Sequence, residues 1–530
     1  MLQRAFCVLT LLAAVLSSAH SGLAQVQASR SPVTPGFADP QRRAKLASAF
    51  GAIDELFTDF AVRNNVPGAA WGIIIDGELA HSGVFGLRDV RGKDPVKPDT
   101  VFRIASMTKS FTAMAILKLR DDGKLSLDDP ADKYVPELTD LRYPTADSRR
   151  ITIRDLLSHA PGFPEDNAWA DRHLHETHEW LSQMMRQGIP FANAPGVAYE
   201  YSNFGFGILG RIVTAASGMP YNDYVRASIL RPLRMTATTL EPTAVRPDRI
   251  ALGYRWEDEQ WKDEELLPDG AFGAMGGMLT TIPDLARYVG ALLAAFPPRD
   301  GTEAGPVGRS SLREMQQIAR TRPAVVTKPG AGAVQLNAGG YGFGLRVTQS
   351  CEFGHIVAHG GGLPGFGTLM QWLPEHGVGI IAFANRTYTG WGGATNAAFE
   401  RLAATGGLQP RSPLPAPALV EARGVVSTLI AEWDDAAVDG IAADNLFLDR
   451  DRERRRADFA AVRAGAGRCD APAGFDYVEN ALRGEWTLTC ERGAVRAAVT
   501  LAPTMPPKVQ VMNVRVVESA APAPRSNCPQ

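Results

Sequence analysis

Ser106-Met107-Thr108-Lys109 opens an apolar stretch that runs to about Arg120 and is followed by Gly123. The stretch predicts a helix that stops at the glycine. Side chains three positions apart share one face of a helix, so the hydroxyl of Ser106 and the amine of Lys109 can meet. Burial lowers the pKa of a lysine, and the free amine can then accept the serine proton. Ser106 is the only serine with a lysine three positions later, although a chance match on a structural helix is an alternative at this point.

A second motif, Tyr201-Ser202-Asn203, follows a loop that contains Pro195-Gly196. It is the only Tyr-x-Asn in the chain. A tyrosine beside an ammonium group sheds its proton more easily and can relay it to a leaving group. The amide of Asn203 can hold a substrate carbonyl. Taken singly, a loop tyrosine that caps a neighbouring helix explains the motif as well.

A third motif, His359-Gly360-Gly361-Gly362, stands at the end of a predicted strand. Consecutive glycines in a strand indicate the close approach of another backbone or of a ligand. The backbone N–H groups of such a strand can bind an oxyanion. A plain bulge is the structural alternative.

Together, and in this order, the three motifs resemble those of the serine β-lactamase and penicillin-binding protein superfamily. The closest likeness is to the class C β-lactamase branch, which also holds DD-peptidases, D-aminopeptidases and family VIII esterases. The resemblance covers about Phe57 to Leu402, with supporting stretches at residues 151–159 and 276–281. It implies a β-lactamase/transpeptidase-like fold.

The resemblance also implies the role of each motif residue. Ser106 would be the acylated nucleophile, Lys109 its activator, and Tyr201 the general base and acid. The backbone N–H groups of Ser106 and Gly362 would form the oxyanion hole. The implied substrate-binding residues are Asn203, His359 and Gly361.

His359 departs from the pattern of many β-lactamases, which have a lysine at this place. Histidine is mostly uncharged at neutral pH, so its hold on a substrate carboxylate is weaker. The departure puts efficient β-lactam hydrolysis in doubt and looks more like the peptidases and esterases of the group. A positive charge from another residue could compensate.

Two other sequence signatures, those of zinc-dependent β-lactamases and of α/β-hydrolases, are incomplete or absent. The stretch His173-Leu174-His175-Glu176-Thr177-His178 nearly has the spacing of the metallo-β-lactamase zinc motif, but Thr177 replaces its aspartate. Since a ligand is missing, we expect a helix surface or lid here and no zinc. The pattern Gly-x-Ser-x-Gly is absent from the chain, which argues against an α/β-hydrolase fold.

Composition describes an ordinary globular protein of 530 residues, 45% hydrophobic, with a formal net charge of -2. The balanced charge gives no reason to expect nucleic acid or an anionic membrane surface as a partner. Length allows two or three domains. The oligomeric state is open.

The N-terminus predicts a signal peptide. Arg4 precedes the apolar run Ala5 to Leu16, and small residues lead to a cleavage site after Ala24. An uncleaved anchor helix is the alternative. No other stretch is apolar enough to span a membrane, so we expect a periplasmic or secreted protein without a membrane span after cleavage.

The order of elements predicts an α/β (α+β) class. A helix at about 44–64 precedes a hairpin, 70–75 with 78–85, around Asp76-Gly77. The middle, about 108–293, looks mostly helical, and strands follow at 341–347, 355–359, 368–373 and 378–384. Strands from both ends would form one antiparallel sheet flanked by helices, with an all-helical lobe across a cleft.

The domain boundaries predicted from this pattern are a signal peptide at 1–24, a hydrolase domain at 25–409 and a Pro-rich linker at 410–417. A small α+β domain would occupy 418–530, helical to about 464, with strands near 484–489, 494–501 and 509–517. Dimerisation or wall binding by this domain is left open. Cys469 and Cys490 are predicted to form a disulfide, and the pairing of Cys351 and Cys528 is open.

The function predicted from these residues is that of an exported serine hydrolase that forms an acyl-Ser106 intermediate. We expect it to act on D-amino-acid peptides, as a D-Ala-D-Ala carboxypeptidase or a D-aminopeptidase, with no metal or organic cofactor. A carboxylesterase or weak β-lactamase is the alternative. A non-catalytic, penicillin-recognising sensor is the alternative from another class.

Overall fold

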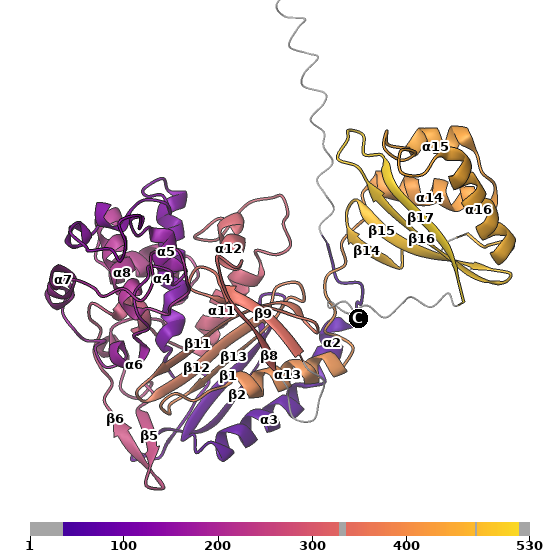
Figure 1. Ribbon diagram of the computed structural model, residues 1–530. Coiled ribbons are helices and arrows are strands. Elements are labelled where there is room, and N and C mark those ends of the chain that lie inside the picture. The colour runs from indigo at the N-terminus through magenta and orange to yellow at the C-terminus, as the bar shows by residue number, and fades with distance from the viewer. Residues whose placement is uncertain (1–34, 328–334, 472–473, 519–530) are drawn as a thin grey trace, which may run out of the picture. The chain divides into compact units, whose positions relative to one another are not determined.

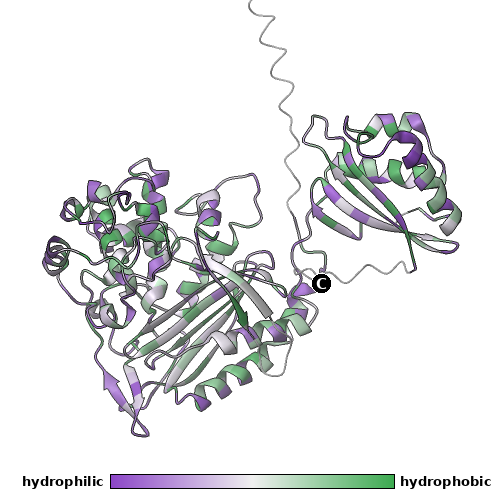
Figure 2. Ribbon diagram, viewed as in Figure 1, coloured by the Kyte–Doolittle hydropathy of each residue, from purple (hydrophilic) through white to green (hydrophobic). Residues whose placement is uncertain are grey.

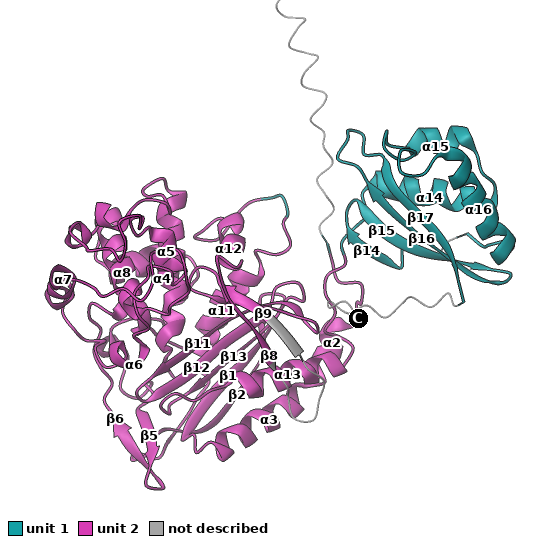
Figure 3. Cartoon of the chain, viewed as in Figure 1, with its two compact units in different colours: residues 1–35, 299–301, 413–521 teal, residues 36–298, 302–412, 522–530 magenta. Residues whose placement is uncertain are grey.

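The computed structural model describes residues 35–327, 335–471 and 474–518 (Figure 1). The predicted signal peptide and Cys528 lie outside these ranges. The described chain divides into two compact units (Figure 3). The larger unit holds residues 36–298 and 302–412; the smaller holds 413–518, with Pro35 and the segment 299–301.

A tight hairpin starts the central sheet of the larger unit. Strands β1 (Gly68–Ile75) and β2 (Glu78–Asp89) are joined by Asp76-Gly77, both with positive φ, at 54° and 85°. Two such residues match the twist of the paired strands, so the predicted hairpin is confirmed. Strand β1 also pairs with β13 (Val378–Ala384), which brings distant parts of the sequence together.

The described residues form a nine-stranded sheet in the order β3-β2-β1-β13-β12-β11-β10-β9-β8, with antiparallel neighbours throughout. The remaining bounds are β3 (Asp94–Pro95), β8 (Arg320–Thr327), β9 (Gln335–Tyr341), β10 (Arg346–Ser350), β11 (Gly354–Leu363) and β12 (Phe366–Leu373). The predicted strand at 341–347 is wrong, because residues 342–345 form the turn between β9 and β10. Gly344 has a φ of 67° there, and a Cβ would lie 2.6 Å from the carbonyl oxygen of Lys109. A glycine turn therefore packs on the helix that carries Lys109.

Helices cover both faces of this sheet. One face packs on α2 (Arg42–Ala47), α3 (Phe50–Arg63) and α13 (Gly392–Ala404) around a core that includes Phe57, Trp71 and Trp391. The predicted helix 44–64 is thus two helices. The hydroxyl of Ser48 bonds to the carbonyl of Lys45 at the break, a bond that competes with helix continuation. The opposite face packs on α11 (Ile282–Leu293), and hydrophobic residues concentrate in the strands and the covering faces of the helices (Figure 2).

A helical lobe completes the larger unit, and its centre is α4 (Thr108–Asp121), which is buried along most of its length. Further helices lie around it. Of all the helices in the described ranges, none is long and apolar enough to cross a membrane. The mostly helical middle of the chain also contains a hairpin, β5 (Gly253–Glu257) with β6 (Gln260–Glu264). The other elements are β4 (Phe102–Arg103), α5 (Ile153–Leu157), α6 (Asn167–Ala170), α7 (His178–Gln187), α8 (Asn203–Ser217), α9 (Tyr221–Val225), α10 (Gly273–Gly276), β7 (Leu279–Thr280) and α12 (Arg309–Met315).

The smaller unit pairs three helices with a four-stranded antiparallel sheet in the order β14-β15-β16-β17. The alternating burial of β15 and β16 directs apolar side chains such as Trp486 to the core shared with the helices. The elements are α14 (Pro417–Ala431), α15 (Asp435–Ile441), α16 (Arg452–Ala466), β14 (Tyr477–Asn480), β15 (Arg483–Cys490), β16 (Gly493–Leu501) and β17 (Val509–Val517). The predicted α+β class of the chain is confirmed.

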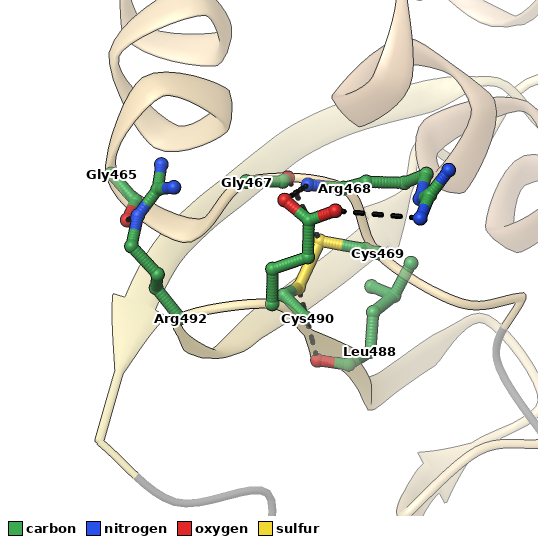
Figure 4. The surroundings of a disulfide bond; sticks show 8 residues. Gly465, Gly467, Arg468, Cys469, Leu488, Cys490 and Arg492 are labelled. Atoms are coloured by element: carbon green, nitrogen blue, oxygen red, sulfur yellow. Dashed lines mark hydrogen bonds and ion pairs between the residues drawn. A yellow bond between two sulfur atoms is a disulfide. The ribbon is translucent and has the colours of Figure 1, made fainter.

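A disulfide between Cys469 and Cys490 fastens the loop after α16 to the end of β15 (Figure 4). Their Cα atoms lie 3.9 Å apart, and the predicted pairing is confirmed. Arg492, just beyond the bridge, donates to the carbonyl oxygens of Gly465 and Ala464. The amide of Arg492 also donates to the carbonyl of Ala466, so the end of α16 is held by the disulfide and by three hydrogen bonds from Arg492.

Candidate active site

A strained turn places Ser106. Residues Ala105–Met107 form one 3-10 turn, and the α-helix itself begins only at Thr108. Ala105 has a φ of 49°, a left-handed conformation that a residue with a side chain adopts only when its surroundings hold it there. The hydroxyl of Thr108 donates to the carbonyl of Ala105 and accepts from the amide of Met278. Ser106 is thereby fixed with 7% of its surface exposed, at the wall of a cavity.

The amine of Lys109 meets Ser106, as the spacing predicts. Its Nζ donates to Ser106 Oγ at 3.0 Å, to Asn203 Oδ1 at 2.5 Å and to the carbonyl oxygen of Met275 at 2.9 Å. Burial lowers the pKa of Lys109 from 10.5 to about 7, although the negative charge of Asp171 opposes the shift. Near neutral pH, about half of the lysine is therefore the free amine.

Tyr201 also lies beside Ser106, and the two share a side-chain hydrogen bond. The Nζ of Lys109 is 4.9 Å from the centre of the tyrosine ring. The expectation that a neighbouring ammonium lowers the pKa of Tyr201 is wrong. Burial raises it, and the bond from Ser106 offsets only a part. Tyr201 therefore carries its proton at neutral pH.

Asn203 faces the lysine rather than the cavity. It begins α8 and is fully buried, its Oδ1 accepts from Lys109, and its Nδ2 donates to Asn167 Oδ1 at 3.1 Å. The cavity lining does not include it. The carboxylate of Asp166 fixes the start of α8 by accepting from the amides of Asn203 and Phe204, both at 2.7 Å. Asn203 thus orients Lys109, and its expected contact with substrate stays a prediction.

The glycines of β11 form a free strand edge at the cavity. Pairing with β10 ends at Ala358, opposite Arg346, whereas pairing with β12 continues to Leu363. Beyond Ala358, alternate residues of this segment therefore have backbone groups directed away from β12 with no strand to pair with, and residues 360–362 all line the same cavity as Ser106. A Cβ on Gly361 would lie 2.1 Å from the carbonyl oxygen of Ile104. The close backbone approach that the glycines indicate is thus found in the structure.

His359 does not line the cavity. Its side chain is on the buried face of β11, 1% exposed, with Nε2 2.8 Å from the hydroxyl of Tyr341. Burial holds the pKa of His359 well below its usual value, so the ring is neutral. Strand alternation turns the ring inward, so the expected contact of His359 with substrate stays a prediction that this position of the ring does not favour.

The cavity has a volume of about 650 Å³, and two arginines that the sequence motifs did not indicate line its wall. They are Arg322 on β8 and Arg346 on β10. Arg322 lies 5.1 Å from the ring centre of Tyr199, and neither arginine forms an ion pair among the described residues. They supply the positive charge that His359 lacks. Nothing in their spacing distinguishes them in the sequence.

The stretch His173 to His178, which nearly has the spacing of a zinc motif, packs against aromatic side chains. The ring of His173 stacks on Trp169 at 4.6 Å and on Trp180 at 5.6 Å between ring centres. Among the residues that the structure describes, no group of three His, Cys, Asp or Glu side chains is placed to hold a metal ion. The stretch is an aromatic surface next to α7.

The chain is similar in sequence to known proteins. The profile of the family described as Beta-lactamase matches residues 53–405. Protein flp of Staphylococcus aureus (strain N315) is 30% identical over 338 residues, 63% of this chain and 62% of that protein. Penicillin-binding protein 4* of Bacillus subtilis (strain 168) is 28% identical over 332 residues, 58% of this chain and 66% of that protein. The chain thus spans slightly less than two thirds of the length of these relatives.

Among solved structures, the octameric penicillin-binding protein homologue from Pyrococcus abyssi has the same fold, with a TM-score of 0.56 at 22% identity. The alignment covers 85% of this chain and 96% of that one.

Proposed function

The chain belongs to the beta-lactamase family of serine hydrolases, and from that membership we propose that it acts through an acyl-Ser106 intermediate on peptides that end in a D-amino acid. The hydrogen bond from Lys109 to Ser106 supports Ser106 as the nucleophile. The two arginines of the cavity support the substrate class. The reaction needs no group outside the chain except substrate and water.

The acylation step follows from the protonation states. The free amine of Lys109 accepts the proton of Ser106 Oγ as this oxygen attacks the substrate carbonyl carbon. The N–H groups of Ser106 and Gly362 donate to the oxyanion of the tetrahedral intermediate. Tyr201, which is protonated, gives its proton to the leaving nitrogen and regains one from Lys109. The C–N bond then breaks and leaves an ester on Ser106.

Deacylation reverses these roles. A water molecule loses a proton to the Lys109–Tyr201 pair and attacks the ester carbonyl, and the oxyanion is held by the same two N–H groups. Collapse of the intermediate returns the proton to Ser106 Oγ and releases the acid. Lys109 is the proton acceptor in this scheme because burial discharges it and at the same time keeps Tyr201 protonated.

Arg322 and Arg346, the two arginines of the cavity, are the reason for proposing a carboxypeptidase. A guanidinium without an ionic partner is well suited to the carboxylate of a C-terminal residue, which it can bind through two hydrogen bonds. Arg346 stands at the Ala358 end of the free strand edge, so the leaving residue of the substrate would lie toward that end. A D-aminopeptidase is the second candidate, because the acid Glu165 also lines the cavity and could bind a substrate ammonium group.

One pair of substrates tests the carboxypeptidase. We expect the wild type to cleave a D-Ala-D-Ala peptide faster than its C-terminal amide, and Arg346→Ala to raise KM for the acid with little effect on the amide. Arg246→Ala is the matched control, since Arg246 is an exposed arginine paired with Asp248. Equal cleavage of acid and amide would reject a carboxylate site. Preference for a free amino terminus would favour the aminopeptidase, and a penicillin adduct without any turnover would favour the sensor.

We also propose that the protein is exported. The predicted signal peptide at residues 1–24 motivates this, and the disulfide of the smaller unit supports it, because such bonds persist in oxidising compartments. Cell fractionation with N-terminal peptide mapping tests the proposal. We expect a mature terminus near Gln25 in the periplasm or medium, and uncleaved protein confined to the cytoplasm would contradict it.

A further inference from the structure

Tyr388 projects into the cavity from the loop between β13 and α13. It lines the cavity wall, and 49% of its surface is exposed. Its backbone is left-handed, with a φ of 52°, an unfavourable conformation for a bulky residue. The loop is nevertheless held in place, because the amide of Tyr388 donates to the carbonyl of Phe366 and the amide of Thr387 donates to the carbonyl of Tyr254. Strain kept by such anchoring is typical of functional sites.

The ring of Tyr388 covers Gly362. A Cβ built on this glycine would lie 2.7 Å from Cδ1 of the tyrosine ring, so the ring occupies the space where another residue would have its side chain. Gly362 is the proposed oxyanion donor. The ring therefore stands at the Gly362 end of the free strand edge, whereas Arg346 stands at the Ala358 end.

A buried carboxylate holds the ring in this position. The hydroxyl of Tyr388 donates to Asp171 Oδ2 at 2.9 Å. Asp171 is 0% exposed, and its Oδ1 has no hydrogen-bond partner among the described residues. A buried carboxylate is costly unless it is bonded, so the tyrosine hydroxyl is its main compensation. Burial raises the pKa of Asp171 to about 6 and also raises the pKa of Tyr388, which keeps the phenol as the donor at neutral pH.

The bond joins two parts of the fold across the cavity. Asp171 directly follows α6 in the helical lobe, and its amide donates to the carbonyl of Asn167, which itself lines the cavity. Tyr388 lies in the loop that follows strand β13, four residues beyond Ala384. The contact therefore links the segment that supports Asn203 to the sheet that carries Gly362.

We infer that Tyr388 is a specificity-determining residue that limits the acyl group of the substrate, and that Asp171 is its positioning residue. The inference rests on the proposed function for the location of the reacting carbonyl between Ser106 and Gly362. With the leaving residue toward Arg346, the acyl portion extends past Gly362 and meets the ring. Short acyl groups, such as the single D-alanyl residue of D-Ala-D-Ala, or flat ones that stack on the phenol, fit there, whereas long flexible chains are excluded.

Acyl-chain selectivity tests this in the full-length protein. We measure kcat/KM for p-nitrophenyl acetate and hexanoate and compare their ratio between variants. Tyr388→Ala is expected to raise the hexanoate-to-acetate ratio at least about tenfold, since each methylene in a shaped pocket affects kcat/KM by about that factor. Asp171→Ala is expected to shift the ratio in the same direction.

Conservative variants separate positioning from general damage. Asp171→Asn keeps an oxygen acceptor for the phenol, so its ratio is expected to stay close to that of the wild type. The double variant Tyr388→Phe with Asp171→Ala is expected to shift the ratio no further than Tyr388→Phe alone. Each of the two substitutions removes the same hydrogen bond, so their effects do not add. Thermal melts confirm that each variant is folded.

Two results would overturn the inference. The first is an unchanged ratio in Tyr388→Ala and in Tyr388→Phe, whatever the absolute rates. The second is a ratio that shifts in Asp171→Asn as much as in Asp171→Ala. Such a result would mean that the negative charge of Asp171, and not its hydrogen bond to Tyr388, sets the selectivity. Failure of the proposed function has a different signature, because turnover of both esters would then persist in Ser106→Ala.

Discussion

Replacing Asn203 with aspartate would place a negative charge against the amine on which acylation depends. Lys109 Nζ lies 2.5 Å from Asn203 Oδ1. Two unit charges about 4 Å apart attract by about 4 kcal/mol at an effective dielectric constant of about 20. The energy corresponds to about 3 pKa units, and a single close countercharge typically gives about 1 to 3. We therefore expect the pKa of Lys109 to rise from about 7 to roughly 8 to 10 in Asn203→Asp.

The direction of the pH effect follows from which form reacts. Acylation needs the free amine, so kcat/KM rises with pH as Lys109 loses its proton, with a midpoint near 7 in the wild type. In Asn203→Asp the midpoint moves to higher pH. At pH 7 the rate falls by about 5- to 500-fold, because about half of the wild-type lysine is the free amine at this pH against about a tenth to a thousandth in the variant, and the rate recovers in alkali. The assay is stopped-flow acylation by p-nitrophenyl acetate between pH 5 and 10.5.

A neutral substitution is the control. Asn203→Leu removes the acceptor without adding charge, so its rate is lower but its profile is not displaced to alkaline pH. The amide of Asn167, which accepts from Asn203 Nδ2, can turn to donate to the new carboxylate. The reasoning is refuted if Asn203→Asp loses the same factor at every pH, because the titrating base is then not Lys109.

Three further changes probe other parts of the structure. Lys109→Arg keeps the charge but cannot supply a free base at neutral pH, so acylation is expected to fall below detection across pH 5 to 10 in the same assay, whereas residual activity with a normal profile would speak against the lysine. Gly361→Ala would bring a Cβ to 2.1 Å from the carbonyl oxygen of Ile104, so we expect a loss of about 1 to 3 kcal/mol in urea unfolding and slower acylation; a stable, active variant would contradict the packing. Cys469→Ser combined with Cys490→Ser opens a loop of sequence separation 21 and is expected to destabilise the smaller unit by about 2 to 4 kcal/mol, read as an earlier calorimetric transition; an unchanged transition would count against that contribution.

Local chemistry made part of the fold and site predictable from the sequence. The Asp76-Gly77 turn has the residues that a tight hairpin requires, and the structure contains that hairpin. The three-residue spacing of Ser106 and Lys109 placed the two side chains within hydrogen-bond distance. The bond forms across the start of α4 and not within a regular helix, because Ser106 belongs to a 3-10 turn.

Features that depend on burial and on distant contacts could not be predicted in this way. The tyrosine of the second motif has a raised pKa because desolvation outweighs the nearby lysine, and only the packed structure reveals that balance. The side chain of His359 points to the buried face of its strand, and the glycines that follow it do not reveal which face that is. Arg322, Arg346 and Tyr388 reach the cavity from separate elements, and no local pattern joins them.

The central claim is that Ser106 is the residue that becomes acylated, and one measurement tests it most directly. Intact wild-type protein is incubated with a fluorescent penicillin, weighed by mass spectrometry and digested to locate the label, in parallel with Ser106→Ala. The account predicts one added penicillin mass on the wild type, mapped to the peptide that contains Ser106, and none on the variant. A label that persists on Ser106→Ala, or maps to another residue of the wild type, would contradict it.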